Sequence, residues 1–174
     1  MSEIIRYAWG ESSLGPFIAA CSERGLVAFE FADRAAASVE ALWARFPDAH
    51  LAEDDAAVAD TIERLATVVD HPEREANLAL DLRGTEYERR VWNALCEIPA
   101  GRTVTYGDIA AKLGAPRDTR EVGEACAANT LAILVPCHRV VKKDGSLAGY
   151  RWGYKRKRAL LVREQQAVAF QLSG

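Results

Sequence analysis

Three adjacent side chains in the last third of the chain could perform nucleophilic chemistry. Cys137, His138 and Arg139 follow one another directly after Pro136. A thiol becomes a strong nucleophile as the thiolate, and a neighbouring imidazole or cation favours that form. At a reference pKa near 8.5 the thiol would be only about 3% ionised at pH 7, so a base would have to assist it. An inert buried cysteine beside a surface histidine is the alternative that these residues leave open.

The same stretch sits in an apolar run over residues 132–141, which predicts a buried strand. Adjacent strand residues point to opposite faces, so His138 could reach Cys137 directly only if the chain turns there. We therefore expect either a turn at residues 136–137 or a water that bridges the thiol and the imidazole. Glu164 is one of the few acids in this half and could orient His138. The resulting hypothesis is a relay from Glu164 through His138 and a water to Cys137.

Helices with capping signals precede this stretch. Thr85 and Glu88 form a capping-box pattern at the start of a helix that ends before the Pro and Gly of residues 99–101. Thr105 is expected to cap a short helix over residues 106–113, and a second helix over 117–128 follows a turn that contains Gly. This pair fits a helix-turn-helix, and an ordinary helical hairpin fits the pattern as well. An Asp-Gly hairpin turn over 142–146 and an amphipathic helix over 155–169 complete this half.

Several polar and aromatic residues flank the two short helices. Arg120 starts the second helix beside Arg117, and either arginine could simply be solvated. Asn129 follows the helix and could cap it or tie it to the cysteine segment. Tyr106 begins the first helix and Tyr150 lies after a glycine. Aromatic side chains in such places either join the core or stack on a base.

The first half is acidic and predicts a sheet with helices. Short strands bounded by turn residues are predicted over 4–9, 16–21, 26–31 and 78–82. Asp33 is expected to cap a helix that runs to about residue 46, and a second helix is expected over 55–69. The boundary lies near residues 83–84, which predicts two domains, 1–82 and 83–174.

Composition limits the classes of function. Of 174 residues, 49% are hydrophobic and 27% charged, which is typical of a soluble globular protein, and no window is long and apolar enough to span a membrane. The chain lacks a signal-peptide core, so we expect it in the cytoplasm. Residues 1–99 hold 9 Lys and Arg against 19 Asp and Glu, whereas residues 100–174 hold 13 against 6. This asymmetry favours contact of the second half with a polyanion. The four cysteines show no zinc-ligand spacing, so no metal is expected.

In these motifs the chain resembles the O6-alkylguanine-DNA alkyltransferases, also called methylated-DNA–protein-cysteine methyltransferases. The run from Pro136 to Arg139 is highly specific to that family. The resemblance is carried by residues 103–110, Arg120, 127–129, 133–140, 149–150 and Glu164. It is strong over about residues 82–166 and weaker over 1–81. Within the bacterial branch the chain is most similar to the carboxyl-terminal, repairing half of the adaptive-response regulator.

The resemblance implies a mixed α/β (α+β) fold with two parts. Residues 1–82 would form a ribonuclease-H-like domain, and residues 83–174 a mostly helical domain that binds DNA and carries the acceptor cysteine. It implies single-turnover DNA repair, in which Cys137 takes the methyl group of O6-methylguanine, and of O4-methylthymine, from a base flipped out of the duplex. The partner would be double-stranded DNA, the protein a monomer, and no cofactor would be needed because the substrate carries its own alkyl group.

The resemblance also implies a role for each candidate residue. His138 would act as a base through a water, with Glu164 orienting it. Tyr106 would donate a hydrogen bond to the departing guanine, Asn129 would hold the helix-turn-helix against the cysteine segment, and Arg120 would enter the vacated space in the base stack. The remaining implied contacts are to DNA from Thr105 and Arg117 and to the substrate pocket from Tyr150, Val140 and Arg151.

Two departures from the family pattern bear on these expectations. Glu121 and Glu124 occupy the helix that would enter the groove, where anions oppose phosphate binding, and Glu124 could pair with Arg120 at i,i+4. Cys21 matches a zinc ligand of some members, but no histidine follows it. Two rival functions are a Cys–His hydrolase, for which no oxyanion-hole motif is evident, and a non-enzymatic helix-turn-helix regulator or lesion sensor. A sensor typically lacks the acceptor cysteine, which this chain has.

Overall fold

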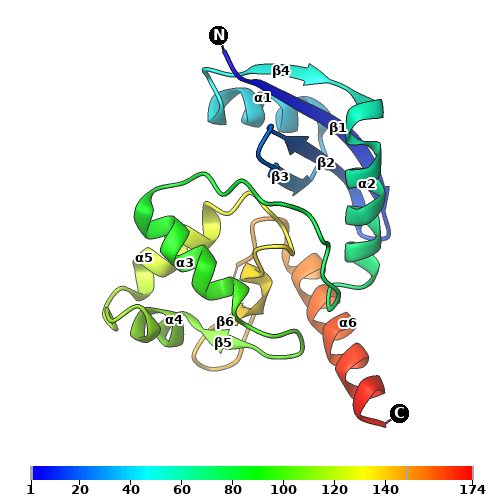
Figure 1. The fold of residues 1–174 in the computed structure, drawn as a ribbon. Coiled ribbons are helices and arrows are strands. Elements are labelled where there is room, and N and C mark those ends of the chain that lie inside the picture. Colours follow the sequence, from blue (N-terminus) through cyan, green and yellow to red (C-terminus); the bar gives the residue numbers. More distant parts are fainter. Residues whose placement is uncertain (1, 148, 174) are drawn as a thin grey trace. The chain divides into compact units, whose positions relative to one another are not determined.

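The computed structural model describes residues 2–147 and 149–173 and contains two compact units (Figure 1). The first comprises residues 1–70 and 76–82, and the second comprises residues 71–75 and 83–174. The mixed α/β class predicted from the sequence is confirmed. The short segment 71–75 lies with the second unit, whereas the sequence boundary near residue 83 assigned it to the first.

The first unit is a four-stranded sheet with one helix on each face. Its elements are β1 (Ile4–Ser12), β2 (Gly15–Cys21), β3 (Leu26–Phe31), α1 (Ala35–Arg45), β4 (His50–Glu53) and α2 (Asp55–Asp70). The strand order is β3-β2-β1-β4, with β1 antiparallel to β2 and parallel to β4. Alternate residues of β1 and β2, including Ile5 and Ile18, pack with Leu42 of α1. The opposite face, at Gly10 and Phe17, meets Ile62 of α2.

Two sequence expectations in this unit are wrong, and one strand was not predicted. Helix α1 begins at Ala35 with Arg34 as N-cap and no side-chain cap bond, so Asp33 does not cap it. The predicted strand over residues 78–82 reduces to a single bridge between Leu26 and Leu80. Asn77, just before it, has φ 53°, a left-handed conformation that interrupts extended chain. Strand β4 was not anticipated, because its four residues are too few to show alternation.

The second unit is mostly helical. Its elements are α3 (Glu86–Cys96), β5 (Val104–Thr105), α4 (Tyr106–Lys112), α5 (Thr119–Ala127), the 3-10 helix η1 (Cys137–Arg139), β6 (Val140–Val141) and α6 (Tyr154–Ser173). The predicted capping box at Thr85 and the cap at Thr105 are confirmed; both hydroxyls accept from the N3 backbone. The indole of Trp92 donates to the carbonyl of Ala125 at 2.9 Å, which ties α3 to α5.

The cysteine segment is not the strand that its apolar run predicted. Residues 132–134 form turns, Ile133 has φ 69°, and the chain enters η1 at Cys137. The run coils because the side-chain amide of Asn129 binds the carbonyls of Leu131 and Val135, at 3.3 and 2.9 Å. The turn at residues 136–137, one of the two predicted outcomes, therefore occurs. The Asp-Gly turn forms at residues 142–146, but β6 pairs in parallel with β5 rather than in a hairpin.

Candidate active site

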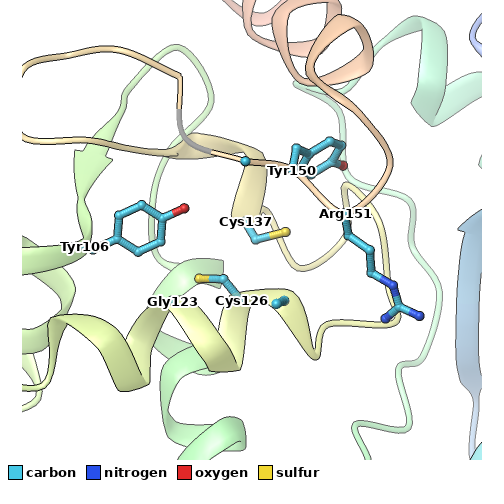
Figure 2. Close-up of a pocket in the computed structure, with 8 residues that line it drawn as sticks. Tyr106, Gly123, Cys126, Cys137, Tyr150 and Arg151 are labelled. Carbon is cyan, nitrogen blue, oxygen red and sulfur yellow. The ribbon is translucent and has the colours of Figure 1, made fainter.

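Cys137 lies at the wall of a cavity of about 280 Å³ in the second unit (Figure 2). We call this space the acceptor cavity. Helices α4 and α5 form one side of it, and η1 with the segment before α6 forms the other. The lining residues are Tyr106, Gly123, Cys126, Ala127, Cys137, Gly149, Tyr150 and Arg151.

The thiol of Cys137 is buried, and polar and cationic neighbours partly offset the effect of burial on its pKa. Burial raises its pKa above the usual value, and this effect exceeds the opposing influence of a hydrogen bond from Asn129 and of the cations Lys157 and Arg151. Asn129 Nδ2 lies 3.3 Å from Cys137 Sγ, and Cys137 is only 6% exposed. Because the resting thiol is protonated, a reaction at this sulfur needs a proton acceptor.

The two residues that follow Cys137 in η1, His138 and Arg139, form a buried ionic group with Glu164. His138 Nε2 is 2.7 Å from Glu164 Oε1, and the same carboxylate accepts from Arg139 Nε at 3.0 Å and Nη2 at 2.8 Å. The histidine and the glutamate are fully buried. Arg139 Nη1 also donates to the carbonyl of Ile98 at 2.6 Å. Arg139 is thus held in a buried ion pair.

The protonation states within this group follow from its contacts. Burial raises the pKa of the Glu164 carboxyl, but hydrogen bonds from His138 and Arg139 lower it further than burial raises it, so Glu164 is ionised. Burial lowers the pKa of His138 despite the hydrogen bond to Glu164, so the imidazole is neutral. An ionised carboxylate only accepts, hence Nε2 carries the proton and Nδ1 presents a lone pair. Nδ1 is buried without a hydrogen-bond partner in the described part of the chain.

Asn129 joins the end of α5 to the cysteine segment through its side chain. Its amide nitrogen contacts two carbonyls of the segment and the sulfur of Cys137, while its Oδ1 accepts from the backbone nitrogen of Leu131 at 2.9 Å. Ala128 is the C-cap of α5. A single fully satisfied amide therefore fixes the loop that positions the thiol.

Two tyrosines face the acceptor cavity. Burial, together with the nearby thiols of Cys126 and Cys137, raises the pKa of Tyr106 to about 12, so its phenol stays protonated and able to donate. The buried Tyr150 hydroxyl has no hydrogen-bond partner among the described residues, and burial raises its pKa well above the usual value. Arg151 stacks its guanidinium 5.6 Å from the centre of the Trp152 ring and donates to the carbonyl of Asn129 at 2.9 Å.

The other predicted residues lie away from the thiol. Arg120 is exposed on α5, and its Nε pairs with Glu124 at 3.2 Å, as the i,i+4 spacing indicated. Arg117 is also exposed, in the turn before α5, and Thr105 uses its hydroxyl as a helix cap. Val140 does not line the cavity in the described structure, contrary to expectation, because it is fully buried and its carbonyl accepts from Lys157 Nζ at 2.6 Å.

Sequence reasoning missed Lys157 and Cys126. Lys157 is fully buried on α6, seven residues before Glu164, so both charges lie on the apolar face of that helix. The spacing of Lys157, Leu160 and Glu164 places all three on one helical face, and this pattern could have identified the lysine from the sequence. Cys126 had no distinguishing signal, since it reads as one more apolar residue on α5.

The described residues show neither a metal-ligand cluster nor a membrane-spanning helix. Across residues 2–147 and 149–173, no three His, Cys, Asp or Glu side chains gather as metal ligands would. No helix in that same part of the chain is long and apolar enough to cross a membrane.

The fold and site match one protein class. Residues 86–166 match the family model of the 6-O-methylguanine DNA methyltransferase DNA-binding domain. Over 162 residues the chain is 42% identical to the bifunctional transcriptional activator/DNA repair enzyme Ada of Escherichia coli, which covers 93% of this chain and 46% of Ada. The chain thus spans about half the length of the Ada-type relatives it matches.

Two shorter relatives match over most of their length. The inducible methylated-DNA–protein-cysteine methyltransferase of Bacillus subtilis is 42% identical over 127 residues, covering 72% of this chain and 71% of that protein. The crystal structure of Mycobacterium tuberculosis OGT in complex with DNA superposes with a TM-score of 0.78 at 36% identity, covering 92% of this chain and 93% of that one. This chain belongs to the methylated-DNA–protein-cysteine methyltransferase family.

Proposed function

We propose that this protein repairs DNA by moving the methyl group of O6-methylguanine, and of O4-methylthymine, onto its own Cys137. The observation that carries the proposal is a thiol at the wall of the acceptor cavity that is followed directly in η1 by a neutral imidazole paired with an ionised carboxylate. Family membership and the likeness to a relative crystallised with DNA support it. The methyl group is out of reach inside a duplex, so the base must be flipped into the cavity.

The proton inventory of the site supports a thiolate mechanism. His138 Nδ1 takes the Cys137 proton through a water, and Glu164 stabilises the imidazolium that forms. The thiolate attacks the methyl carbon, so an S–C bond forms while the C–O6 bond breaks, and the electron pair passes to the guanine ring. Tyr106, which stays protonated because its pKa is about 12, donates to the ring as that charge develops. The guanine gains one proton overall, and the thiol loses one.

The transfer occurs once for each molecule. The product at Cys137 is a thioether, which has no thiolate and is a poor leaving group. Besides Cys137, the described lining holds one more thiol, that of Cys126, and transfer of the alkyl group to it would only form another thioether. The protein is therefore consumed stoichiometrically, and no cofactor takes part.

DNA binding is assigned to the second half of the chain, residues 83–174, as a helix-turn-helix made by α4 and α5. Arg120 fills the space that the flipped base leaves, and Thr105 and Arg117 contact the backbone beside it. The net positive charge of residues 100–174 supports this assignment. Residues 1–82 form a separate ribonuclease-H-like domain. The protein acts as a monomer on duplex DNA in the cytoplasm.

Intact mass spectrometry tests the proposal. Wild-type protein is incubated with excess duplex DNA carrying one O6-methylguanine, and its mass should rise by one methyl group, localised to Cys137 by peptide mapping. Cys137→Ala should show no mass gain yet retain binding to the duplex, while Cys96→Ser serves as the matched control for loss of a thiol. Unmodified wild-type protein after excess substrate would contradict the proposal. Turnover of a thioester would instead favour a hydrolase, and binding without demethylation a lesion sensor.

A further inference from the structure

A second thiol faces the acceptor cavity and has no part in the proposed transfer. Cys126 lies on α5, is 7% exposed and lines the same space as Cys137. Figure 2 shows the side chains of Cys126 and Cys137 beside the same space, with their sulfurs turned in different directions. The two thiols are near enough for Cys137 to contribute to the raised pKa of Cys126, after the larger effect of burial. The other two cysteines lie elsewhere, Cys21 in the first unit and Cys96 at the exposed end of α3.

One residue, Asn129, contacts both cysteines. The backbone nitrogen of Asn129 donates to the carbonyl of Cys126 at 3.2 Å, and its side-chain nitrogen lies 3.3 Å from the sulfur of Cys137. Asn129 is 1% exposed and fully hydrogen-bonded. The two cysteines therefore line one cavity, and the segments that carry them are joined through Asn129.

We infer that the acceptor cavity is also a two-thiol site for soft, thiophilic ligands, represented by monosubstituted trivalent arsenicals, which bridge Cys126 and Cys137. Soft sulfur ligands select soft ions and metalloids, whereas hard cations need oxygen donors. Among the described residues, the cavity lining holds no carboxylate and no imidazole, and His138 turns its Nε2 toward Glu164 instead. A ligand satisfied by two sulfurs fits this set, and one that needs three or four protein ligands does not.

The bridging reaction balances without another reactant. An arsenoxide, R–As=O, condenses with two thiols to give R–As(S–Cys)₂ and one water, so two As–S bonds form while the arsenic–oxygen bond breaks. Both thiols enter the reaction protonated, which matches the raised pKa of Cys137 and the Cys126 pKa of about 12 that burial produces. The bridge occupies the sulfur that accepts the alkyl group, and an excess of a small dithiol reverses it.

The site is tested by titrating the protein with phenylarsine oxide. In the absence of DNA, native mass spectrometry should detect one bound arsenical per chain with the loss of one water. Methyl transfer should then fall in step with occupancy and return after addition of 2,3-dimercaptopropanol. The measurement of methyl transfer rests on the proposed function. The mass measurement of arsenical binding does not depend on it. A protein that binds the arsenical but never transfers a methyl group would contradict the proposed function alone.

Variants at Cys126 separate a bridge from attachment at one sulfur. Cys126→Ser keeps the size of the side chain and Cys126→Ala keeps its apolar character, so at least one should fold. Each variant is compared with its own uninhibited transfer rate. Losing the second anchor should raise the arsenical concentration for half-inhibition by at least about tenfold, since the second bond forms at high effective concentration. Cys96→Ser should match the wild type. Equal sensitivity of both Cys126 variants and the wild type, or no uptake by the wild type, would overturn the inference.

Discussion

Replacing Glu164 with Gln probes the buried ionic group that Glu164 forms with His138 and Arg139. The substitution keeps the shape of the side chain but removes the charge that faces Arg139 through contacts of 3.0 and 2.8 Å. Arg139 is 8% exposed and would be left as a buried cation without its carboxylate. Breaking one partner of such a pair costs about 3–5 kcal/mol, a large share of the roughly 5–15 kcal/mol that stabilises a typical domain. We expect a loss of this size in urea unfolding of Glu164→Gln.

The same change should weaken the base. The amide of Gln can still accept the proton of His138 Nε2, so the ring orientation survives, but the imidazolium formed during transfer loses its anionic neighbour. General-base assistance contributes about 10²–10⁴ in rate, and we expect the single-turnover transfer constant of Glu164→Gln to fall by about 10² or more at a temperature where the variant is folded. Glu164 also raises the pKa of His138 through its hydrogen bond. The acid limb of the variant's pH–rate profile should therefore move to lower pH.

A matched control separates the specific effect from the loss of any glutamate. Glu97→Gln removes an exposed carboxylate whose partner is Lys112 on the surface. It should change the free energy of unfolding by less than about 1 kcal/mol and leave the transfer constant unchanged. If Glu164→Gln matched this control in both measurements, the account of a buried charge that holds Arg139 and assists His138 would be refuted. If Glu164→Gln transferred the methyl group slowly but kept the wild-type pH–rate profile, Glu164 would have a structural role only.

Three further changes follow from other contacts. Glu124→Gln should tighten binding to duplex DNA about two- to fivefold at fixed low salt. The change releases Arg120 from an exposed ion pair worth under about 1 kcal/mol and removes an anion from the proposed DNA interface. Weaker binding in a fluorescence anisotropy titration would contradict this. Lys157→Met should slow methyl transfer most at low pH, because the lost cation no longer lowers the pKa of Cys137; a uniform slowing at every pH would speak against it. The stability of the wild type should fall as pH drops below about 6.5, since burial lowers the folded pKa of His138 and the unfolded state takes up the proton first; His138→Gln should fall less steeply in urea titrations across that range.

The sequence indicated the reactive residues better than the backbone that holds them. The Cys137–His138 adjacency, Glu164 and the capping residues Thr85 and Thr105 were recognisable because their chemistry or local geometry depends on neighbours in the chain. The apolar run before Cys137 was assigned to a strand because its composition resembles one. Its actual course depends on Asn129, whose amide replaces the hydrogen bonds that a neighbouring strand would have supplied. A short polar side chain can redirect an apolar segment, and periodicity does not record this.

The partners of the two buried charges on α6 could not be predicted from the sequence. Lys157, Leu160 and Glu164 share one face of α6, and a sequence can reveal that two charges accompany an apolar stripe. It cannot reveal their partners. Lys157 donates a hydrogen bond to the carbonyl of Val140 in β6, and Glu164 binds His138 and Arg139 in η1. The two charged side chains therefore bind different parts of the segment 137–140. A buried charge destabilises the fold unless it is paired or hydrogen-bonded in this way. Helix α6 therefore holds the whole of residues 137–140 in place, and the position of the thiol depends on a helix that contributes no residue to the cavity it serves.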